Sequence, residues 1–346
     1  MKRLFFGLVA IFSTLILAAC GGGGGGGSSS SSTSSGTSTT YTSSGSVGEV
    51  LNFTINTTAS PPTYSYTIVK SAYGLTGQTG SGTLTANSDL SYTPSGSTNS
   101  RVYPLPNGLL VGGIKLNLQG TQTVVPLLGV SSPITTLDSL AGTYNYISTA
   151  CAATANGYPT HPNCGSDYGT IKVNSNGTYT HCRTTNITTS PSCSTTTGTI
   201  SNPSSGIWEY VRTGSSNKNY LLAFTASNGQ NVLVIDFNDA GGYGYGHGIA
   251  STQPTASYVT GDANGTWIFN SNNGNSGATS ISGASYSTIS TGGTNSGTLT
   301  FDNPWSGLVR AVGLTDTGYA ILAGTGVYVY RSNTSTNPYY EVGIRQ

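Results

Sequence analysis

Four cysteines in the body of the chain have the number and spacing of a disulfide framework. They are Cys151, Cys164, Cys182 and Cys193. The amino terminus, described below, indicates export to an oxidising compartment, where an even number of cysteines is typical of disulfides. Of the three possible pairings, Cys151 with Cys164 and Cys182 with Cys193 would each close a short polar loop that contains proline. We predict these two local bridges.

The same region offers a metal site as the alternative. His161, Cys164, His181 and Cys182 include a His-x-x-Cys spacing, and imidazole and thiolate are the ligands that zinc prefers. Adjacent residues of a strand point to opposite faces, however, so His181 and Cys182 would diverge. The disulfide prediction is therefore preferred, and neither a metal nor a cofactor is expected.

Residues 236–241 partly match the start of a calcium-binding loop. Positions one, three and six of the loop fit, beginning at Asp236. Position five is Ala240, and position twelve is His247, where a bidentate glutamate is expected. We interpret the segment as an acidic turn after a strand, and a calcium ion bound in another geometry stays open.

An aromatic run with alternating glycines is the candidate ligand-binding face. Within residues 242–248, Tyr243, Tyr245 and His247 alternate with glycine. In an extended chain the three rings share one face, and a row of rings can stack on sugars or flat ligands. The alternatives are that these residues fill a barrel interior or that the run is a loop.

Familiar catalytic patterns are absent from the sequence. It holds three histidines, none in a nucleophile setting, and it has neither a Gly-x-Ser-x-Gly elbow nor a His-Glu-x-x-His motif. Carboxylates such as Asp236 and Asp239 look the same as turn residues. The sequence therefore predicts a protein without enzymatic activity.

The elements that must position these residues are strands. Short runs of Val, Ile, Thr and Tyr, which favour strands, fill the chain after the leader, and no window shows a sustained helical period. Three hairpins are legible: 168–173 with 178–182, 220–225 with 231–237, and 318–323 with 327–331. Asn-Gly at 176–177 favours a type I′ turn, and the apolar runs of the second hairpin indicate strands buried on both faces. We predict an all-β, antiparallel, hairpin-rich fold.

A short sequence pattern recurs among these strands. Gly-Thr followed by Leu or Ile occurs at Gly82, Gly169, Gly198 and Gly297. The irregular spacing excludes a solenoid. We interpret the pattern as a recurring start of a strand.

A domain boundary is predicted at residues 133–138, between two groups of strands. A small N-terminal β-domain would span 47–137, and a larger up-and-down β-barrel or sandwich would span 138–346. The Gly-x-Tyr opening at 142–144, followed by hairpins, is similar to that of small up-and-down barrels such as lipocalins.

The amino terminus has the form of an export signal. Lys2 and Arg3 precede a largely apolar segment, 4–19, which is shorter than the roughly 20 residues of a spanning helix. It ends in Leu-Ala-Ala-Cys at Cys20, which resembles the lipobox of bacterial lipoproteins. The resemblance implies that residues 1–19 are removed and that Cys20 carries lipid. Because Gly21 and not Asp follows, it also implies delivery to the outer membrane.

The segment after Cys20 is predicted to be a tether. Residues 21–46 are almost wholly Gly, Ser and Thr, which offer too little apolar surface to offset the entropy of ordering. We therefore expect residues 20–46 to be a disordered linker with a reach of about 28 Å.

Charge limits the range of partners. Charged residues make up 7% of the chain, and without Lys2 and Arg3 there are 10 Lys+Arg (12 less 2) against 11 Asp+Glu. A nucleic-acid-binding face needs a basic patch, so we expect no nucleic-acid partner. Because the chain is nearly neutral, we expect it to attach to the membrane through its lipid and not through charge.

Cys20, the glycines at 21–27 and the hairpin-rich C-terminal half together resemble surface lipoproteins related to transferrin-binding protein B. Those proteins are rich in Lys and Glu, unlike this chain, so the resemblance implies display on the surface and carries no binding residues. The leading hypothesis is a non-enzymatic lipoprotein on the cell surface or in the periplasmic leaflet of the outer membrane. It would display a β-rich module that binds a protein or glycan. The alternatives are a hydrolase of an envelope polymer and a subunit of a sheath or filament, assembled through strand edges.

Overall fold

The fold consists of strands. The computed structural model describes residues 37–346 apart from 99, 106, 119, 154–158, 185–193, 205, 240–243, 324–325 and 334–338. It contains twenty-four strands and one 3-10 turn, η1 (Asp138–Leu140). All neighbouring strands pair antiparallel, which confirms the all-β, hairpin-rich prediction. No helix in the described ranges is long and apolar enough to cross a membrane.

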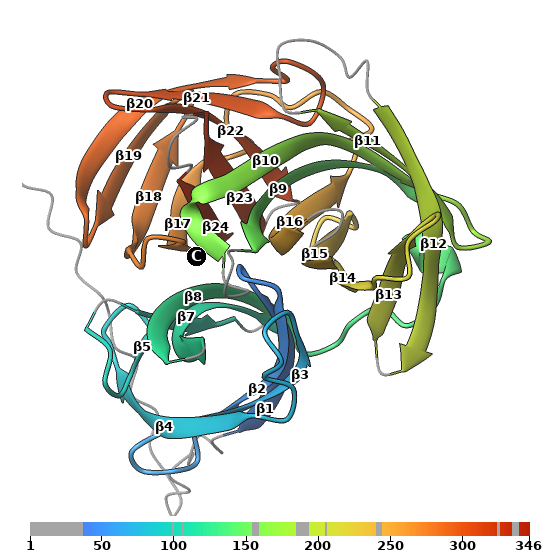
Figure 1. Cartoon of the computed structure of the whole chain (residues 1–346). Coiled ribbons are helices and arrows are strands. Elements are labelled where there is room, and N and C mark those ends of the chain that lie inside the picture. The colour runs from blue at the N-terminus through green and yellow to red at the C-terminus, as the bar shows by residue number, and fades with distance from the viewer. Residues whose placement is uncertain are drawn as a thin grey trace, which may run out of the picture. The chain divides into compact units, whose positions relative to one another are not determined.

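The strands close into three barrels of eight strands each (Figure 1). The first barrel comprises β1 (Ser38–Gly45), β2 (Glu49–Asn56), β3 (Thr63–Ser71), β4 (Thr79–Ala86), β5 (Tyr92–Pro94), β6 (Val102–Pro104), β7 (Leu109–Leu118) and β8 (Thr121–Val130). The second comprises β9 (Gly142–Ala153), β10 (Pro159–Val173), β11 (Thr178–Thr184), β12 (Ser194–Ser204), β13 (Ile207–Arg212), β14 (Asn219–Thr225), β15 (Asn231–Asp239) and β16 (Gly244–Thr252). The third comprises β17 (Gly265–Ser271), β18 (Ser276–Ser282), β19 (Ser285–Ser290), β20 (Gly293–Phe301), β21 (Val309–Gly313), β22 (Thr317–Ala323), β23 (Val327–Ser332) and β24 (Tyr340–Arg345).

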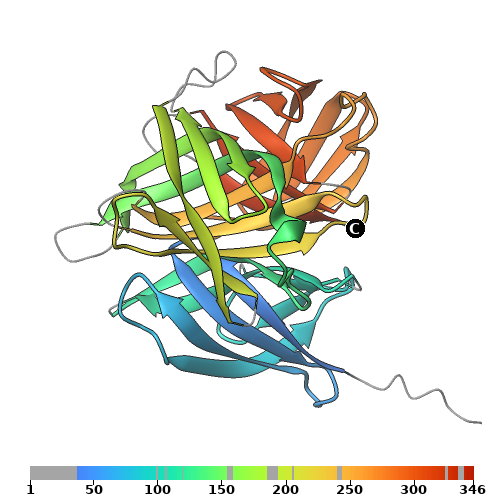
Figure 2. The ribbon, with the colours of Figure 1, turned by 90° about the vertical axis from the view of Figure 1, so that its right-hand side faces the viewer.

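Each barrel is an up-and-down meander whose first and last strands pair. Those pairs are β1 with β8, β9 with β16 and β17 with β24. The strands run obliquely in the side view of Figure 2, as expected because closure requires barrel strands to tilt. Closure leaves no unpaired sheet edge in any of the three barrels.

The predicted domain organisation needs two corrections. The boundary at 133–138 does fall between β8 and β9, but residues 138–346 hold two barrels and not one. Residues 38–45 of the predicted tether form β1, because their backbone pairs with β2 and β8 and Tyr41 is buried inside the first barrel. Residues 20–36 of the tether, Cys20 among them, lie outside the described residues.

The three predicted hairpins are confirmed as β10–β11, β14–β15 and β22–β23. The turn at Asn176 and Gly177 is not type I′, because only Gly177 has a positive φ (81°). Asn174 N–H donates to Thr178 O, and Gly177 N–H donates to Asn174 O. This is the three-residue connection with glycine in the left-handed position.

Glycine lies directly opposite tyrosine at several inward-facing positions. The cross-strand partners are Tyr64 with Gly82, Tyr146 with Gly169, Tyr179 with Gly198, Tyr286 with Gly297 and Tyr328 with Gly343. A Cβ on any of these glycines would lie between 2.0 and 3.0 Å from the tyrosine ring. The first four are the Gly-Thr positions of the sequence, and they lie inside β4, β10, β12 and β20. The interpretation as strand starts is therefore wrong, because the glycine makes room for a ring.

Strands with two apolar faces fill two kinds of core. One face packs inside its own barrel, in three separate clusters. The other face joins a shared core to which all three barrels contribute, for example through Val111, Leu222 and Ile321. Residues 220–225 and 231–237 are buried on both faces, as predicted: Leu221 and Ile235 face inward, and Leu222 and Val234 face the shared core.

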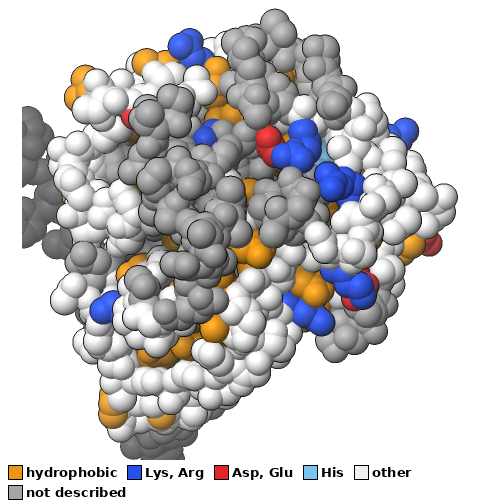
Figure 3. Space-filling view, viewed as in Figure 1, with side chains coloured by type: hydrophobic (Ala, Val, Ile, Leu, Met, Phe, Trp, Pro, Cys, Tyr) orange, Lys and Arg blue, Asp and Glu red, His pale blue; other side chains and the backbone are white. Residues whose placement is uncertain are grey.

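Polar contacts also join the barrels. Ser44 Oγ donates to Asp236 Oδ2 (2.9 Å) between the first and second barrels. Arg331 Nη1 of the third barrel donates to Tyr168 Oη of the second (2.7 Å). The surface in Figure 3 carries few charged side chains among many uncharged polar ones, which agrees with the composition.

Candidate binding pocket in the third barrel

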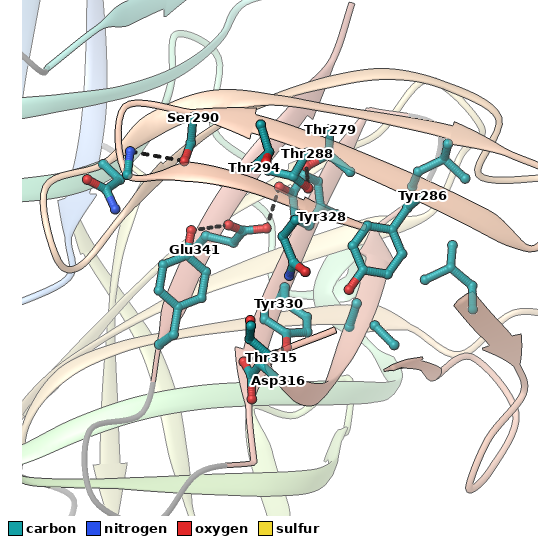
Figure 4. Close-up of a pocket in the computed structure, with 18 of the residues that line it drawn as sticks. Thr279, Tyr286, Thr288, Ser290, Thr294, Thr315, Asp316, Tyr328, Tyr330 and Glu341 are labelled. Carbon is teal, nitrogen blue, oxygen red and sulfur yellow. Dashed lines mark hydrogen bonds between the residues drawn. The ribbon is translucent and has the colours of Figure 1, made fainter. Parts of the chain in front are cut away.

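The third barrel contains a cavity of about 290 Å³ (Figure 4). Its size lies at the lower end of the range of small-molecule sites, roughly 300–1,000 Å³. The cavity exists because β18, β19 and β20 turn short polar side chains inward, among them Thr279, Thr288, Ser290 and Asn295. The corresponding cluster inside the second barrel is dominated by Tyr, Trp, Leu and Ile.

Glu341 is the most deeply buried acidic group of the pocket. It lies on β24, directly opposite Tyr330 of β23. Tyr328 Oη donates to Glu341 Oε1 (2.7 Å), and Tyr339 Oη donates to Oε2. Burial raises the pKa of Glu341 to about 7, although the two hydrogen bonds oppose this shift. The carboxyl therefore changes protonation state near neutral pH.

Asp316 is the second acidic group, and it lies on the loop before β22. Tyr330 Oη donates to Asp316 Oδ2 (2.9 Å). Oδ1 is buried and has no hydrogen-bond partner among the described residues. Burial raises the pKa of Asp316 above its usual value. Asp316 as a whole is half-buried, and hydrogen bonds from Tyr330 and from the Thr317 backbone oppose the shift, so its carboxyl is held in a fixed position beside the cavity.

Tyrosine rings and aliphatic side chains complete the wall. Tyr286, Tyr328, Tyr330 and Tyr339 line the cavity together with Ile281, Leu299, Val309, Ala311, Ala320 and Leu322. Burial raises the pKa of Tyr330 and Tyr339, so both hydroxyls stay protonated. Tyr328 packs edge-on against Trp267, with ring centroids 5.5 Å apart. The pocket thus combines an apolar wall with a cluster of hydroxyl and carboxyl groups.

Among the described residues, no Lys, Arg or His lines the cavity. Arg331 does not line the cavity, but its positive charge opposes the rise in the pKa of Asp316. The Arg331 side chain points away from the barrel interior and hydrogen-bonds Tyr168 of the second barrel. The two carboxyls of the pocket are therefore not neutralised by a cation from the wall.

The predicted ligand face at Tyr243, Tyr245 and His247 does not form a free surface. His247 is 0% exposed, and its Nδ1 lies 3.3 Å from Tyr340 Oη of the third barrel. Tyr245 is half-buried and packs edge-on against Tyr73 of the first barrel. Tyr243 lies outside the described residues. This prediction is wrong for His247 and Tyr245 because the outer face of β16 is covered by the neighbouring barrels.

The cysteines are described only in part. Cys182 is half-buried on β11 and is disulfide-bonded. Cys151 and Cys164 are direct backbone partners between β9 and β10, which is the arrangement of a cross-strand bridge. Cys193 and the side chains of Cys151 and Cys164 lie outside the described residues, so both pairings remain predictions.

The metal alternatives gain no support. His181 is buried inside the second barrel, where Tyr210 Oη lies 2.9 Å from its Nδ1, while Cys182 faces the opposite side of the strand. Asp236 lies within β15 and faces the first barrel, so residues 236–239 form neither the predicted acidic turn nor the start of a calcium loop. The described residues hold no cluster of three potential ligands from His, Cys, Asp and Glu.

The residues of this pocket were not predicted from the sequence. Tyr328 and Tyr330 alternate within a recognised hairpin, which places both rings on one face, and this alternation could have identified them. Asp316 and Glu341 are separated from each other by two strands in the sequence, and it is the pairing of β22, β23 and β24 that brings them to one cavity.

Comparisons with known proteins identify no relative of established function. No family model and no curated protein matches the chain. One solved structure to which it is similar is a protein of unknown function from the DUF3598 family of Nostoc punctiforme, at 14% identity. The match covers 60% of this chain and 97% of that one, with a TM-score of 0.22. The function has to be inferred from the geometry of the pocket.

Proposed function

We propose that this protein is a non-enzymatic lipoprotein of the outer membrane whose third barrel binds a small molecule. The observation that carries the binding proposal is the cavity of about 290 Å³ that is lined by four tyrosines, the buried carboxyl of Glu341 and the half-buried carboxyl of Asp316. Sites of this kind combine an apolar wall with a few placed polar groups. The anchor is supported by the lipobox-like ending at Cys20.

Binding in this barrel can be tested with a pocket-filling variant. Ala311 lies on β21, lines the cavity and is 5% exposed, so Ala311→Phe would occupy the space without changing charge. Saturation-transfer NMR with a library of small fragments should give hits with the wild-type protein that are lost with Ala311→Phe. Equal hits for both proteins, when both show the same circular dichroism, would place binding elsewhere.

The anchor needs its own test. Metabolic labelling with a clickable fatty acid should mark the wild-type protein and leave Cys20→Ser unmarked. Protease treatment of intact cells then separates the two faces of the outer membrane, because only protein on the cell surface is cleaved without rupture. Unlabelled wild-type protein would refute the lipoprotein proposal and leave the binding proposal untouched.

A hydrolase is the second candidate, because Asp316 and Glu341 line one cavity. A pair of carboxyls with separated pKa values is the usual equipment for cleaving glycosides. Both oxygens of Glu341 already accept hydrogen bonds from tyrosines, which favours a fixed binding group over a group that must exchange protons with a substrate. Release of nitrophenol from nitrophenyl glycosides that is lost in Glu341→Gln would favour the hydrolase instead.

The sheath or filament hypothesis has less support than these two candidates. It depended on strand edges free to pair between molecules. The described strands form closed barrels, and a closed barrel has no such edge.

A further inference from the structure

We propose that the ligand of the third barrel is a small organic cation, an amine or a quaternary ammonium compound, held between Asp316 and Glu341. This inference rests on the proposed binding function and adds the chemical class of the ligand. It follows from three independent properties of the wall: its charge, its hydrogen-bonding capacity and its aromatic rings.

The charge of the wall favours a cation. Asp316 and Glu341 both line the cavity, and no Lys, Arg or His of the described residues lines it. Tyr330 links them, because its hydroxyl donates to Asp316 and its strand position lies directly opposite Glu341. Burying acidic groups without a compensating cation is unfavourable. A positively charged ligand would supply the missing partner, whereas an anionic ligand such as a fatty acid or a phosphate ester would be repelled.

The hydrogen-bonding capacity of the wall points the same way. The hydroxyl protons of Tyr328, Tyr330 and Tyr339 are all donated to the two carboxyls. What these groups still offer to a ligand is the remaining acceptor capacity of the carboxylate and phenol oxygens. A protonated primary amine has three donors and no acceptor, which complements this set, whereas a quaternary ammonium centre has no N–H and would be held by charge and by the rings alone.

The aromatic rings supply the third property. Four tyrosines line a cavity of about 290 Å³, and Figure 4 shows Tyr330 beside Asp316, with Tyr286 across the cavity from Glu341. A cation over the face of a tyrosine ring gains about 0.5–2 kcal/mol, most where water is excluded. The rings and the aliphatic side chains of the wall therefore favour a cation that is partly apolar, such as a methylated or aromatic amine.

Matched pairs of probes test the charge directly. Choline and 3,3-dimethylbutan-1-ol have nearly the same shape and differ in whether the centre is charged, and benzylamine and benzyl alcohol form a second such pair. Binding to the mature protein in a non-ionic detergent can be followed by the fluorescence of Trp267, which contacts Tyr328, and by calorimetry. We expect at least one cation to bind ten-fold or more tightly than its neutral partner.

Substitutions of the two carboxyls test whether these groups cause the preference for the cation over its neutral partner. Asp316→Asn and Glu341→Gln should each reduce affinity for the cation at least five-fold and leave the affinity for its neutral partner unchanged. Asp138→Asn, which removes an exposed carboxyl outside the pocket, should change neither.

The outcomes separate the ligand class from the binding function. Equal affinity for the charged and neutral members of both pairs, in a wild-type comparison that needs no variant, would overturn the cation inference and leave the binding function in place. Failure of both cations to bind would also overturn it. If, in addition, no fragment binds in a manner that Ala311→Phe abolishes, the proposed function fails as well.

Discussion

At the scale of the residue, the unusual feature is a set of buried carboxyls without ion-pair partners. Glu49 and Asp236 are both 0% exposed at the contact of the first and second barrels, and Glu341 is buried in the third. Burial raises the pKa of Glu49 to about 8 and that of Glu341 to about 7. Burial and the charge of Glu49 raise the pKa of Asp236. All three carboxyls bind protons more tightly in the folded than in the unfolded protein.

The first prediction is that stability falls as the pH rises from 6.5 to 8. In this window the unfolded glutamates are ionised while the folded ones still hold protons, so unfolding releases protons and becomes more favourable at higher pH. Burial lowers the pKa of His181 and His247, so both are neutral in the folded protein, while their unfolded imidazoles are about half protonated at pH 6.5 and lose nearly all of that charge by about pH 7.5. Their opposing contribution therefore offsets part of the decline near pH 6.5 and fades toward pH 8. Urea unfolding across the window should show a loss of about 1 kcal/mol per pH unit for each group that titrates.

Glu49→Gln tests the assignment. It keeps the acceptor for Ser71 Oγ, which now donates to Glu49 Oε1 (2.9 Å), and removes the titration. The decline between pH 7 and 8 should flatten in this variant and persist in Asp138→Asn. A decline of the same slope in Glu49→Gln would show that other groups are responsible.

The second prediction concerns the cysteines. Cys151 and Cys164 are opposed on neighbouring strands, and Cys182 is disulfide-bonded. Peptide mapping without reductant should recover Cys151 linked to Cys164 and Cys182 linked to Cys193. Crossed pairs would contradict the local bridges, and alkylation of free thiols in the native protein would contradict oxidation altogether.

Single residues were the hardest part to predict from sequence. The alternation at Tyr245 and His247 was interpreted correctly, since both lie on one face of β16. Whether that face meets solvent or another barrel depends on Tyr73 and Tyr340, which are distant in sequence. The pocket was missed for a related reason, because its opposite wall comes from β18, β19 and β20, which lie far in the sequence from Asp316 and Glu341.

At the scale of the element, the tyrosine–glycine pairs govern how the strands fit inside the barrels. Tyr328 is held on three sides: its hydroxyl donates to Glu341, its ring packs against Trp267, and its face lies over Gly343. The ring therefore has little freedom to move aside. Local patterns predicted the hairpins well, because strand alternation and turn residues are properties of neighbouring positions. The same local patterns led to a wrong interpretation of the recurring Gly-Thr sequence, because each of these glycines makes room for a tyrosine on the neighbouring strand.

The third prediction is that Gly343→Ala destabilises the protein and impairs the pocket. The new Cβ would lie 2.0 Å from Tyr328 Cε1, and overpacking of this kind costs about 1–3 kcal/mol. Chemical denaturation should show the loss, and pocket binding should weaken because Tyr328 must shift. The matched control is Gly142→Ala on β9, where the nearest heavy atom is 3.5 Å away and the change should stay within about 0.5 kcal/mol. Equal effects for both variants would refute the role of the tyrosine–glycine pair.

At the scale of the whole molecule, the three barrels share one core. It includes buried residues from each barrel, such as Val50, Val234 and Val342. The sequence revealed strands buried on both faces but not the number of barrels, because every hairpin looks alike and closure joins β9 to β16 across about a hundred residues. The shared core implies that no barrel is an independent folding unit.

The fourth prediction is therefore a single unfolding transition. Ile321 faces the shared core and is 1% exposed, whereas Ile289 of the same barrel is 68% exposed. Ile321→Ala should lower stability by about 2–5 kcal/mol, and Ile289→Ala by no more than about 0.5 kcal/mol. Trp208 in the second barrel and Trp267 in the third, observed in single-tryptophan variants, should report coincident transitions in both proteins. Separate transitions for the two tryptophans would mean that the barrels fold independently.

Fluorine NMR of protein labelled with 3-fluorotyrosine can show whether the interior of the third barrel is the binding site. Tyr286 and Tyr330 line the pocket, whereas Tyr144 and Tyr210 are buried inside the second barrel. Their resonances can be assigned with single Tyr→Phe variants. Addition of choline or of a hit from the fragment library should shift the resonances of Tyr286 and Tyr330 in a saturable manner and leave those of Tyr144 and Tyr210 in place. Saturable shifts confined to tyrosines outside the third barrel, or no shift at millimolar ligand, would contradict the claim.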